Sequence, residues 1–152
     1  MLEVANLAEL AGHVGRKLGT SDWIIVDQRM IDAFAEATGD HQWIHVDVER
    51  AKREMPGGKT IAHGYLTLSL LPRLNQSIFA IRSRKRGVNY GSNKVRFTAP
   101  VPAGSRIRGH LTLKALEEMP GGGHRLTMEA TVEVEGAERP ALVAETLSLV
   151  YE

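Results

Sequence analysis

The sequence predicts a single domain, residues 1–152, of the α+β class, with one long buried helix and an antiparallel sheet. The chain has 152 residues, of which 43% are hydrophobic and 24% charged, ordinary values for one globular domain. The stretch 64–76 is apolar on nearly every side, which is typical of a buried helix. From residue 94 onward apolar and polar residues alternate, which is typical of strands with one buried face. A helix followed by consecutive strands favours α+β.

The first half of the chain predicts one well-bounded helix between shorter elements. Residues 1–20 carry apolar residues at helical spacing and then two glycines, which indicates a short helix and a loop. The run 23–26 is a short strand candidate. It leads into a helix that begins near Asp27, a favourable N-cap, and is stopped by Gly39. A further helical turn or two is expected over 48–53.

The second half changes from helical to strand periodicity. Pro72 lies inside the helix expected over 64–76, and its missing N–H predicts a kink or an early end there. The last run of the chain is apolar on both faces, which indicates a central strand. The strands are expected over 94–99, 107–114, 126–135 and 141–151.

The nine residues 39–47 hold two acids and two imidazoles. Asp40 follows the predicted helix end, and His45 titrates near neutrality if unperturbed. An Asp and a His that converge on one small volume form a general acid/base constellation. The alternative is a loop Asp that caps a local turn and a His at the surface. His41 and His45 also have the donor types of a metal site, but aligning them needs a helix that Gly39 has ended, so we expect no metal.

A second motif, residues 60–65, precedes the predicted buried helix. If that helix starts at Gly64, its first N–H groups are free to face a ligand, and a thioester carbonyl oxygen would be stabilised there. The alternative is that Gly64 only allows close helix–sheet packing. His63 is expected to hold the loop by a hydrogen bond to the backbone.

The two motifs, 38–47 and 61–64, resemble those of the MaoC-like family of (R)-specific enoyl-CoA hydratases, whose fold is the hot dog, an antiparallel β-sheet wrapped around a long central helix. The similarity covers about residues 20–150. It is strongest to the NodN-type branch, through residues 40–45 and 89–97.

The resemblance implies a hydro-lyase that adds water to trans-2-enoyl thioesters and gives (R)-3-hydroxyacyl thioesters. His45 would take a proton from water and Asp40 would deliver one to the α-carbon, although the two roles can be reversed or shared. No cofactor is implied, since coenzyme A enters only as part of the substrate. Gln42 and Trp43 stand where the family usually has Asn-Pro, which puts acyl-chain specificity in question. The expected oxyanion and substrate-binding residues are Gly64, His63, Ala62 and Gln42.

Charge and composition narrow the partners. The formal net charge of +1 argues against a dedicated nucleic-acid or membrane-surface protein, and the absence of cysteine excludes disulfides and thiolate chemistry. No signal segment or run of membrane-spanning length is evident, so we expect a cytoplasmic protein. The one basic run, 82–86, is either a solvated loop or a clamp for coenzyme A phosphates formed by Arg84, Lys85 and Arg86.

Two other functions stay open, namely an acyl-CoA thioesterase of the same fold and a non-catalytic acyl-thioester binding protein. In each case the partner would be an acyl-CoA or an acyl carrier protein thioester. We also expect a homodimer, because a sheet with a helix on its concave face still has an exposed edge strand that a second copy can pair. The candidate edge strand is 89–97.

Overall fold

The computed structural model describes residues 1–152 and confirms the α+β class. The helices are α1 (Leu7–Ala11), α2 (Gln28–Thr38), α3 (Trp43–Val46), α4 (Val48–Glu54), α5 (Gly64–Ser69) and α6 (Leu71–Asn75), with a short 3₁₀ turn at Pro56–Gly58. The strands are β1 (Leu2–Val4), β2 (Lys17–Thr20), β3 (Ile24–Val26), β4 (Phe79–Ile81), β5 (Arg86–Phe97), β6 (Ser105–Glu118), β7 (His124–Val134) and β8 (Leu142–Tyr151).

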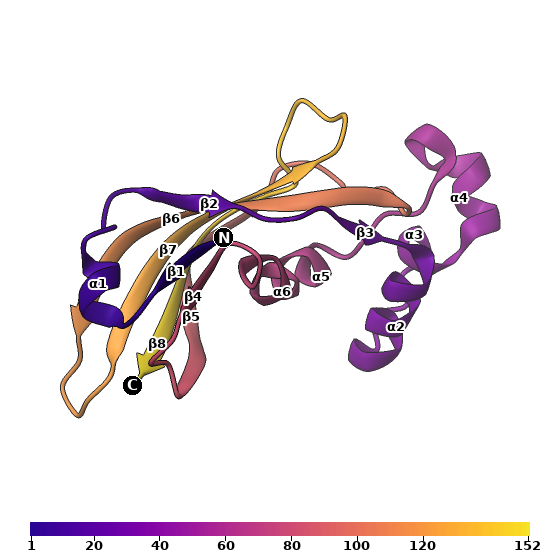
Figure 1. The fold of residues 1–152 in the computed structure, drawn as a ribbon. Coiled ribbons are helices and arrows are strands. Elements are labelled where there is room, and N and C mark those ends of the chain that lie inside the picture. The colour runs from indigo at the N-terminus through magenta and orange to yellow at the C-terminus, as the bar shows by residue number, and fades with distance from the viewer.

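A six-stranded sheet runs in the order β2-β6-β7-β8-β5, with β3 also paired to β6. All of its pairings are antiparallel. Helices α5 and α6 lie against one face of this curved sheet, whereas α2, α3 and α4 project beyond one end of it (Figure 1). The architecture is therefore a sheet wrapped around a helical segment, with a separate helical group at one end.

The central helix is not one long rod, contrary to the expectation from the resemblance. It is divided into α5 and α6, and the break falls just before Pro72, as its missing N–H predicted. Leu70 N–H is shared between the carbonyls of Leu66 and Thr67 at the break. The segment is also not buried on every side, since Tyr65 is 68% exposed. Its inner side chains, Leu66, Leu71 and Leu74, join the main hydrophobic core.

Two strands lie in the N-terminal region where only a short helix and a loop were predicted. Strand β1 pairs in parallel with β4, and β2 pairs with β6, both far away along the chain. Strands of three and four residues give no usable alternation, and their pairing depends on partners that local patterns do not reveal. The predicted helix itself is present as α1, capped by the Asn6 side chain.

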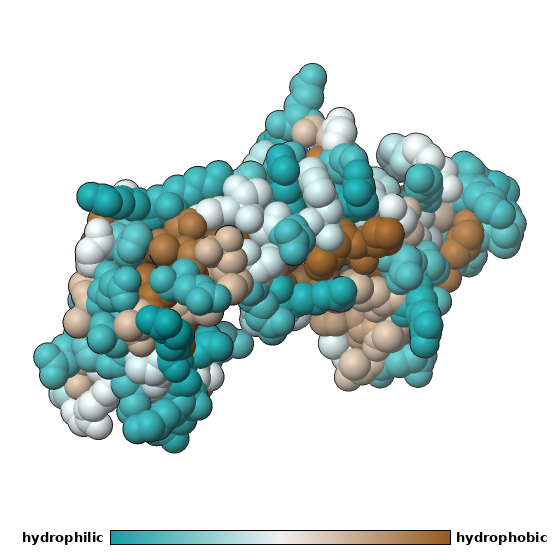
Figure 2. All heavy atoms as spheres, in the orientation of Figure 1, coloured by the Kyte–Doolittle hydropathy of each residue, from teal (hydrophilic) through white to brown (hydrophobic).

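Strand β5 is the edge of the sheet, as predicted, and β8 is internal, between β7 and β5. The expectation that residues 94–99 have one buried face is wrong, because β5 is exposed along almost its whole length and Phe97 is 45% exposed. The sequence alternates there, but only a few side chains have partners: Val95 packs partly against the main core and Phe97 lies edge-on to the Tyr65 ring. The face in Figure 2 is largely hydrophilic with a few separate hydrophobic patches.

None of the helices combines the length and the apolar character that a membrane crossing requires.

Candidate active site

The first site residue is placed by the end of helix α2. The Asp27 side chain accepts a hydrogen bond from Met30 N–H at 2.9 Å and caps the helix start, as predicted. Gly39 ends the helix in the left-handed region, with φ 77°, where glycine avoids the steric penalty of a Cβ. The chain therefore leaves α2 abruptly, and Asp40 begins the loop that leads to α3.

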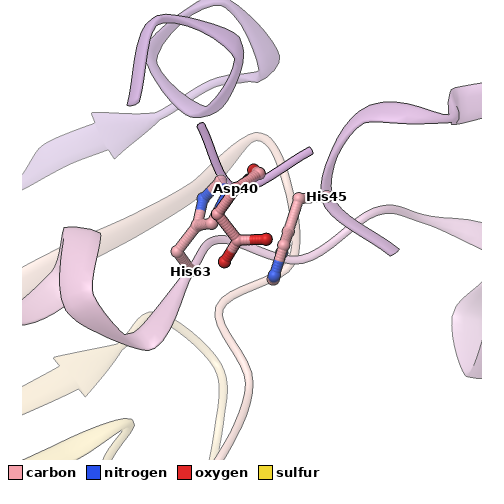
Figure 3. A group of neighbouring side chains, drawn as sticks. All are labelled: Asp40, His45 and His63. Atoms are coloured by element: carbon pink, nitrogen blue, oxygen red, sulfur yellow. The ribbon is translucent and has the colours of Figure 1, made fainter. Parts of the chain in front are cut away.

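Asp40 is exposed, and its carboxylate is only lightly held. Oδ1 accepts one hydrogen bond, from Gln42 N–H at 3.3 Å. This is the local turn capping that the sequence analysis kept as the alternative role for Asp40. The same carboxylate also projects toward the imidazoles of His45 and His63 (Figure 3). Turn capping and a place in the site are thus compatible, because a carboxylate has further lone pairs.

His45 lies on α3, a single helical turn that was not predicted, and it is not a surface histidine. It is only 7% exposed, and its Nδ1 lies 2.6 Å from the carbonyl oxygen of Ile61. A carbonyl oxygen only accepts, so Nδ1 carries the hydrogen and donates it. The neutral ring is therefore held with a bare lone pair on Nε2, which is the form that a general base requires.

Burial lowers the pKa of His45 below its ordinary value of 6.5. The hydrogen bond to the Ile61 carbonyl opposes this shift, the neighbouring His63 adds to it, and the charge of Asp40 opposes it. Desolvation outweighs the other causes, because the Asp40 carboxylate is itself exposed to water and its attraction for the imidazolium is the smallest of the four. His45 is therefore neutral at physiological pH and able to accept a proton.

The backbone of His45 is held by Gln28, a residue that the sequence did not mark, and by the second motif. Gln28 Nε2 donates to the His45 carbonyl at 2.7 Å, and Gln28 Oε1 accepts from the Thr60 hydroxyl. Ile61 N–H donates to the Ile44 carbonyl at 3.0 Å, which ties the second motif to α3. No local pattern marks Gln28 for this role, since its partners are far along the chain.

His63 holds the loop through the backbone, as predicted. Its Nε2 donates to the Asp40 carbonyl at 2.9 Å, and the residue is only 3% exposed. Its ring stacks on that of His45, with centroids 3.8 Å apart and planes inclined by 25°. Its Nδ1 is buried without a partner. The two motifs thus bring Asp40, His45 and His63 into one group, visible in Figure 3.

The possible metal ligands that the structure brings together are not the His41–His45 pair considered from the sequence. His41 is exposed and faces Glu36, 3.5 Å away, whereas donor atoms of Asp40, His45 and His63 lie within 4.8 Å of one another. Imidazole binds a metal along its ring plane at about 2.0–2.1 Å. Two nearly stacked rings direct their lone pairs along similar planes and do not converge on one point between them. This arrangement fits a metal poorly, and the expectation of metal-free activity stays a prediction.

Gly64 borders a hollow of about 380 Å³ that is also lined by His45 and Phe97. Gly64 N–H has no acceptor within the chain, so it is free to bind a ligand oxygen. A Cβ at this position would lie 2.9 Å from the Phe97 ring, so the packing reason for glycine is real as well. Both interpretations of Gly64 from the sequence therefore have structural support.

The other predicted substrate residues are less directly placed. Ala62 is buried beside the hollow, and its N–H is already used by the Val101 carbonyl at 2.8 Å. Gln42 is exposed and its side chain forms no hydrogen bond within the chain. Ala62 can shape the hollow, whereas Gln42 is free to reach a ligand.

The basic run lies in the turn between β4 and β5. Arg84 lines a larger cavity of about 650 Å³, between α5–α6 and strands β5, β7 and β8, and not the hollow beside His45. The Arg86 guanidinium lies over the Tyr151 ring, 4.1 Å from its centroid. The structure therefore does not bring these cations to the Asp40–His45 pair.

Comparison with known sequences places most of the chain in one family. The model of a family described as "MaoC like domain" matches residues 9–137. The chain is 51% identical to 3-hydroxyacyl-thioester dehydratase Z of Mycobacterium tuberculosis over 142 residues, which is 93% of each chain. It is 48% identical to nodulation protein N of Rhizobium leguminosarum bv. viciae over 146 residues, covering 95% of this chain and 91% of that protein.

Solved structures agree with this placement. An R-hydratase from Pseudomonas aeruginosa matches with a TM-score of 0.76 and 25% identity, covering 97% of this chain and 86% of that one. The (R)-hydratase from A. caviae involved in PHA biosynthesis matches with a TM-score of 0.71 at 23% identity, covering 89% and 94%, and supports the fold alone. The hot-dog fold expected from the two motifs is thereby confirmed.

Proposed function

The chain belongs to the MaoC-like domain family, and on that premise we propose that it is an (R)-specific hydro-lyase for trans-2-enoyl thioesters. A hydratase or dehydratase activity on 3-hydroxyacyl thioesters rests on the near-complete overlap with the mycobacterial dehydratase. The (R) stereochemistry and the division of labour between Asp40 and His45 are the finer parts of the proposal.

One observation carries the chemistry. His45 has a bare Nε2 in a hollow that also contains a free Gly64 N–H, and the Asp40 carboxylate lies beside it. A base, a second proton-transfer group and a donor for a carbonyl oxygen are the three parts that hydration of an enoyl thioester requires.

The reaction follows from these parts. His45 Nε2 takes one proton of a water molecule while the water oxygen forms a bond to C3 of the enoyl group. Electrons move to the thioester oxygen, where Gly64 N–H stabilises the developing charge. The proton that His45 has taken passes to the Asp40 carboxylate, which delivers it to C2, so both groups return to their starting forms. In sum a hydroxyl adds to C3 and a proton to C2, and no cofactor takes part.

We extend the proposal to the acyl chain. Thr67 lines the hollow beside His45, and the next residue, Leu68, lines the larger cavity along α6. An acyl chain that leaves the hollow along this helix would enter that cavity. Leu68→Trp should then reduce activity on long-chain substrates and spare crotonyl-CoA. Equal losses on both substrates would contradict this path.

A homodimer is part of the same proposal. Strand β5 is an unpaired edge and exposes the large side chains Val88, Tyr90 and Phe97. Edge-to-edge pairing with a second copy would satisfy its backbone groups and cover these side chains. Light scattering with in-line chromatography tests this, because a particle of 16.7 kDa at micromolar concentration would refute it.

We also propose a clamp for coenzyme A phosphates at Arg84, Lys85 and Arg86. It now requires the coenzyme A head group to reach the turn before β5, on this subunit or on its partner. Charge reversal through Arg84→Glu and Lys85→Glu should raise KM for acyl-CoA substrates. An unchanged KM would refute the clamp. Arg16→Glu serves as the charge-matched control, because Arg16 directly precedes β2, at the opposite edge of the sheet from β5.

The deciding experiment follows crotonyl-CoA by its ultraviolet absorbance and measures thiol release in parallel. Loss of the enoyl absorbance without thiol release is expected. Thiol release without loss of that absorbance would favour the thioesterase, and neither change would favour a non-catalytic binding protein. Prolonged chelation should leave the rate unchanged, and a loss that zinc restores would contradict the metal-free mechanism.

A further inference from the structure

A second buried imidazole lies in the site, and the proton transfers described above do not use it. His63 precedes α5 and is 3% exposed. Its ring lies between two others, with the His45 centroid 3.8 Å away on a near-parallel plane and the Phe34 centroid 4.8 Å away at 52°. A histidine that served only to fill the core would destabilise the fold, because its buried ring nitrogens need hydrogen-bond partners.

The two nitrogens of His63 are used unequally. Nε2 lies 2.9 Å from the Asp40 carbonyl and must donate to it, so it carries the hydrogen of the neutral ring. Nδ1 is then a bare acceptor, buried and without a partner. Protonation of Nδ1 would create a buried N–H donor with no acceptor as well as a buried charge. The hydrogen bond that His63 makes through its side chain is therefore the one from Nε2 to the Asp40 main chain.

The stacking on His45 has a consequence for catalysis. The proposed reaction places a positive charge on His45, and a second charge on a ring 3.8 Å away would oppose it. The titratable groups facing His63 are Asp40, from the loop after α2, and His45, from α3, while Phe34 of α2 is apolar. Helix α5 adds only Tyr65, which is exposed. His63 is thus the group that packs directly on the proposed base, and its stacked ring holds the plane of the His45 imidazole.

We infer that His63 is a positioning residue for the Asp40–His45 pair. Its Nε2–H anchors the Asp40 main chain at the face of His45, and its stacked ring supports the His45 ring during proton transfer. The two imidazoles hold opposite tautomers, with the hydrogen on Nδ1 in His45 and on Nε2 in His63. This inference rests on the proposed function for its catalytic consequence, but not for the tautomers.

Two substitutions separate the roles of the donor and the ring. His63→Phe keeps a ring against His45 and removes the N–H that holds Asp40. His63→Gln keeps an amide donor for the Asp40 carbonyl and removes the ring. We expect His63→Phe to lower kcat by about 10²-fold with little change in KM, the scale of a small misplacement of catalytic groups. His63→Gln should regain part of that loss.

The pH profile distinguishes positioning from simple packing. The neighbouring His63 contributes to lowering the pKa of His45, so removing it should raise that pKa. Because the base must be neutral, the acid limb of kcat/KM should move to higher pH in His63→Gln. Parent-like kcat in His63→Phe, or equal losses in both variants with an unmoved acid limb, would overturn the inference. Thermal unfolding of each variant identifies losses caused by misfolding.

A measurement on the parent protein tests the inference without any assay of activity. NMR of the imidazole nitrogens should show the hydrogen of His63 on Nε2, bonded to the Asp40 carbonyl, and the hydrogen of His45 on Nδ1. The spectra of His63→Gln and His45→Ala assign the two signals. A His63 hydrogen on Nδ1 in place of Nε2 would overturn the inference even if the enzyme proves to be a hydratase. Absence of hydration with the expected tautomers would instead refute the proposed function.

Discussion

His110 on the sheet and His45 in the helical group differ in how fully their nitrogens are bonded. His110 Nδ1 lies 2.9 Å from the Thr20 hydroxyl and 3.1 Å from Lys17 Nζ, while its Nε2 lies 2.8 Å from Glu133. His45 has one nitrogen bonded to the Ile61 carbonyl and the other free. Both residues are histidines with carboxylates nearby, but only His45 has an unoccupied nitrogen that faces a hollow.

The same contrast extends to the surroundings of each residue. On the sheet, cations and carboxylates pair across strands, as in Arg108 with Glu133 and Arg106 with Glu135. The Arg108 hydrogen bond, followed by that of His110, holds the pKa of Glu133 below its usual value. Around His45, the Gly64 N–H and the His63 Nδ1 are both left without partners. Saturated polar groups stabilise the sheet, whereas the unsaturated ones mark the place where a substrate can bind.

The largest expected effect comes from removing the unsaturated pair. Asp40→Asn and His45→Ala should each lower hydration by about 10²–10⁴-fold, since each removes a proton-transfer group. His110→Ala is the matched control and should leave turnover near that of the parent. Initial rates with crotonyl-CoA measure the effect, and circular dichroism checks the fold. Near-normal turnover in both site variants would show that the unsaturated groups do not carry the reaction.

The pH dependence sharpens the contrast between the two histidines. The pKa of His45 is lowered, so the acid limb of kcat/KM should lie below the ordinary value of 6.5. Activity is therefore kept as the pH falls to 6.5 and is lost only as it passes the lowered value. His110→Ala should not move this limb. An acid limb above 6.5 would mean that Asp40 outweighs desolvation at His45.

Substitution of Gly64 tests whether glycine is needed there for packing against Phe97 or for access of the substrate. Gly64→Ala places a Cβ against the Phe97 ring and should destabilise the protein by about 1–3 kcal/mol, the range for overpacking. Phe97→Leu in the same chain should restore most of this stability, measured by urea unfolding. If activity returns with stability, the need for glycine is steric. A double variant that is stable but inactive would show that the Cβ itself obstructs the substrate.

The smallest effect is expected on the sheet. Arg108→Met should change the free energy of unfolding by no more than about 1 kcal/mol, because the pair is partly exposed and salt screens it. The stabilisation by Glu133, whose pKa is lowered, is present above pH 4.5 and is lost as the pH falls through the lowered pKa. Turnover should stay unchanged. A large loss of activity would show that this ion pair on the sheet contributes to the site.

Local chemistry was sufficient to predict the elements that position the first motif. Asp27 and Gly39 bound helix α2 as expected, because a cap and a left-handed glycine act within a few residues. The break near Pro72 follows from the missing N–H in the same way. Strand β5 was predicted as an edge, but its exposure was not, since burial depends on what covers a face.

The sequence by itself determined which residues could do the chemistry and where the chain turns near them. Motifs 38–47 and 61–64 selected Asp40, His45, His63 and Gly64, and identified the family. Only the tertiary structure decided how these residues act. The carbonyls of Ile61 and Asp40, each far along the chain from the imidazole it binds, fix opposite tautomers on His45 and His63. Hydrogen bonds and burial between distant segments leave no local pattern, so the tautomers and the lowered pKa of His45 are properties of the folded chain.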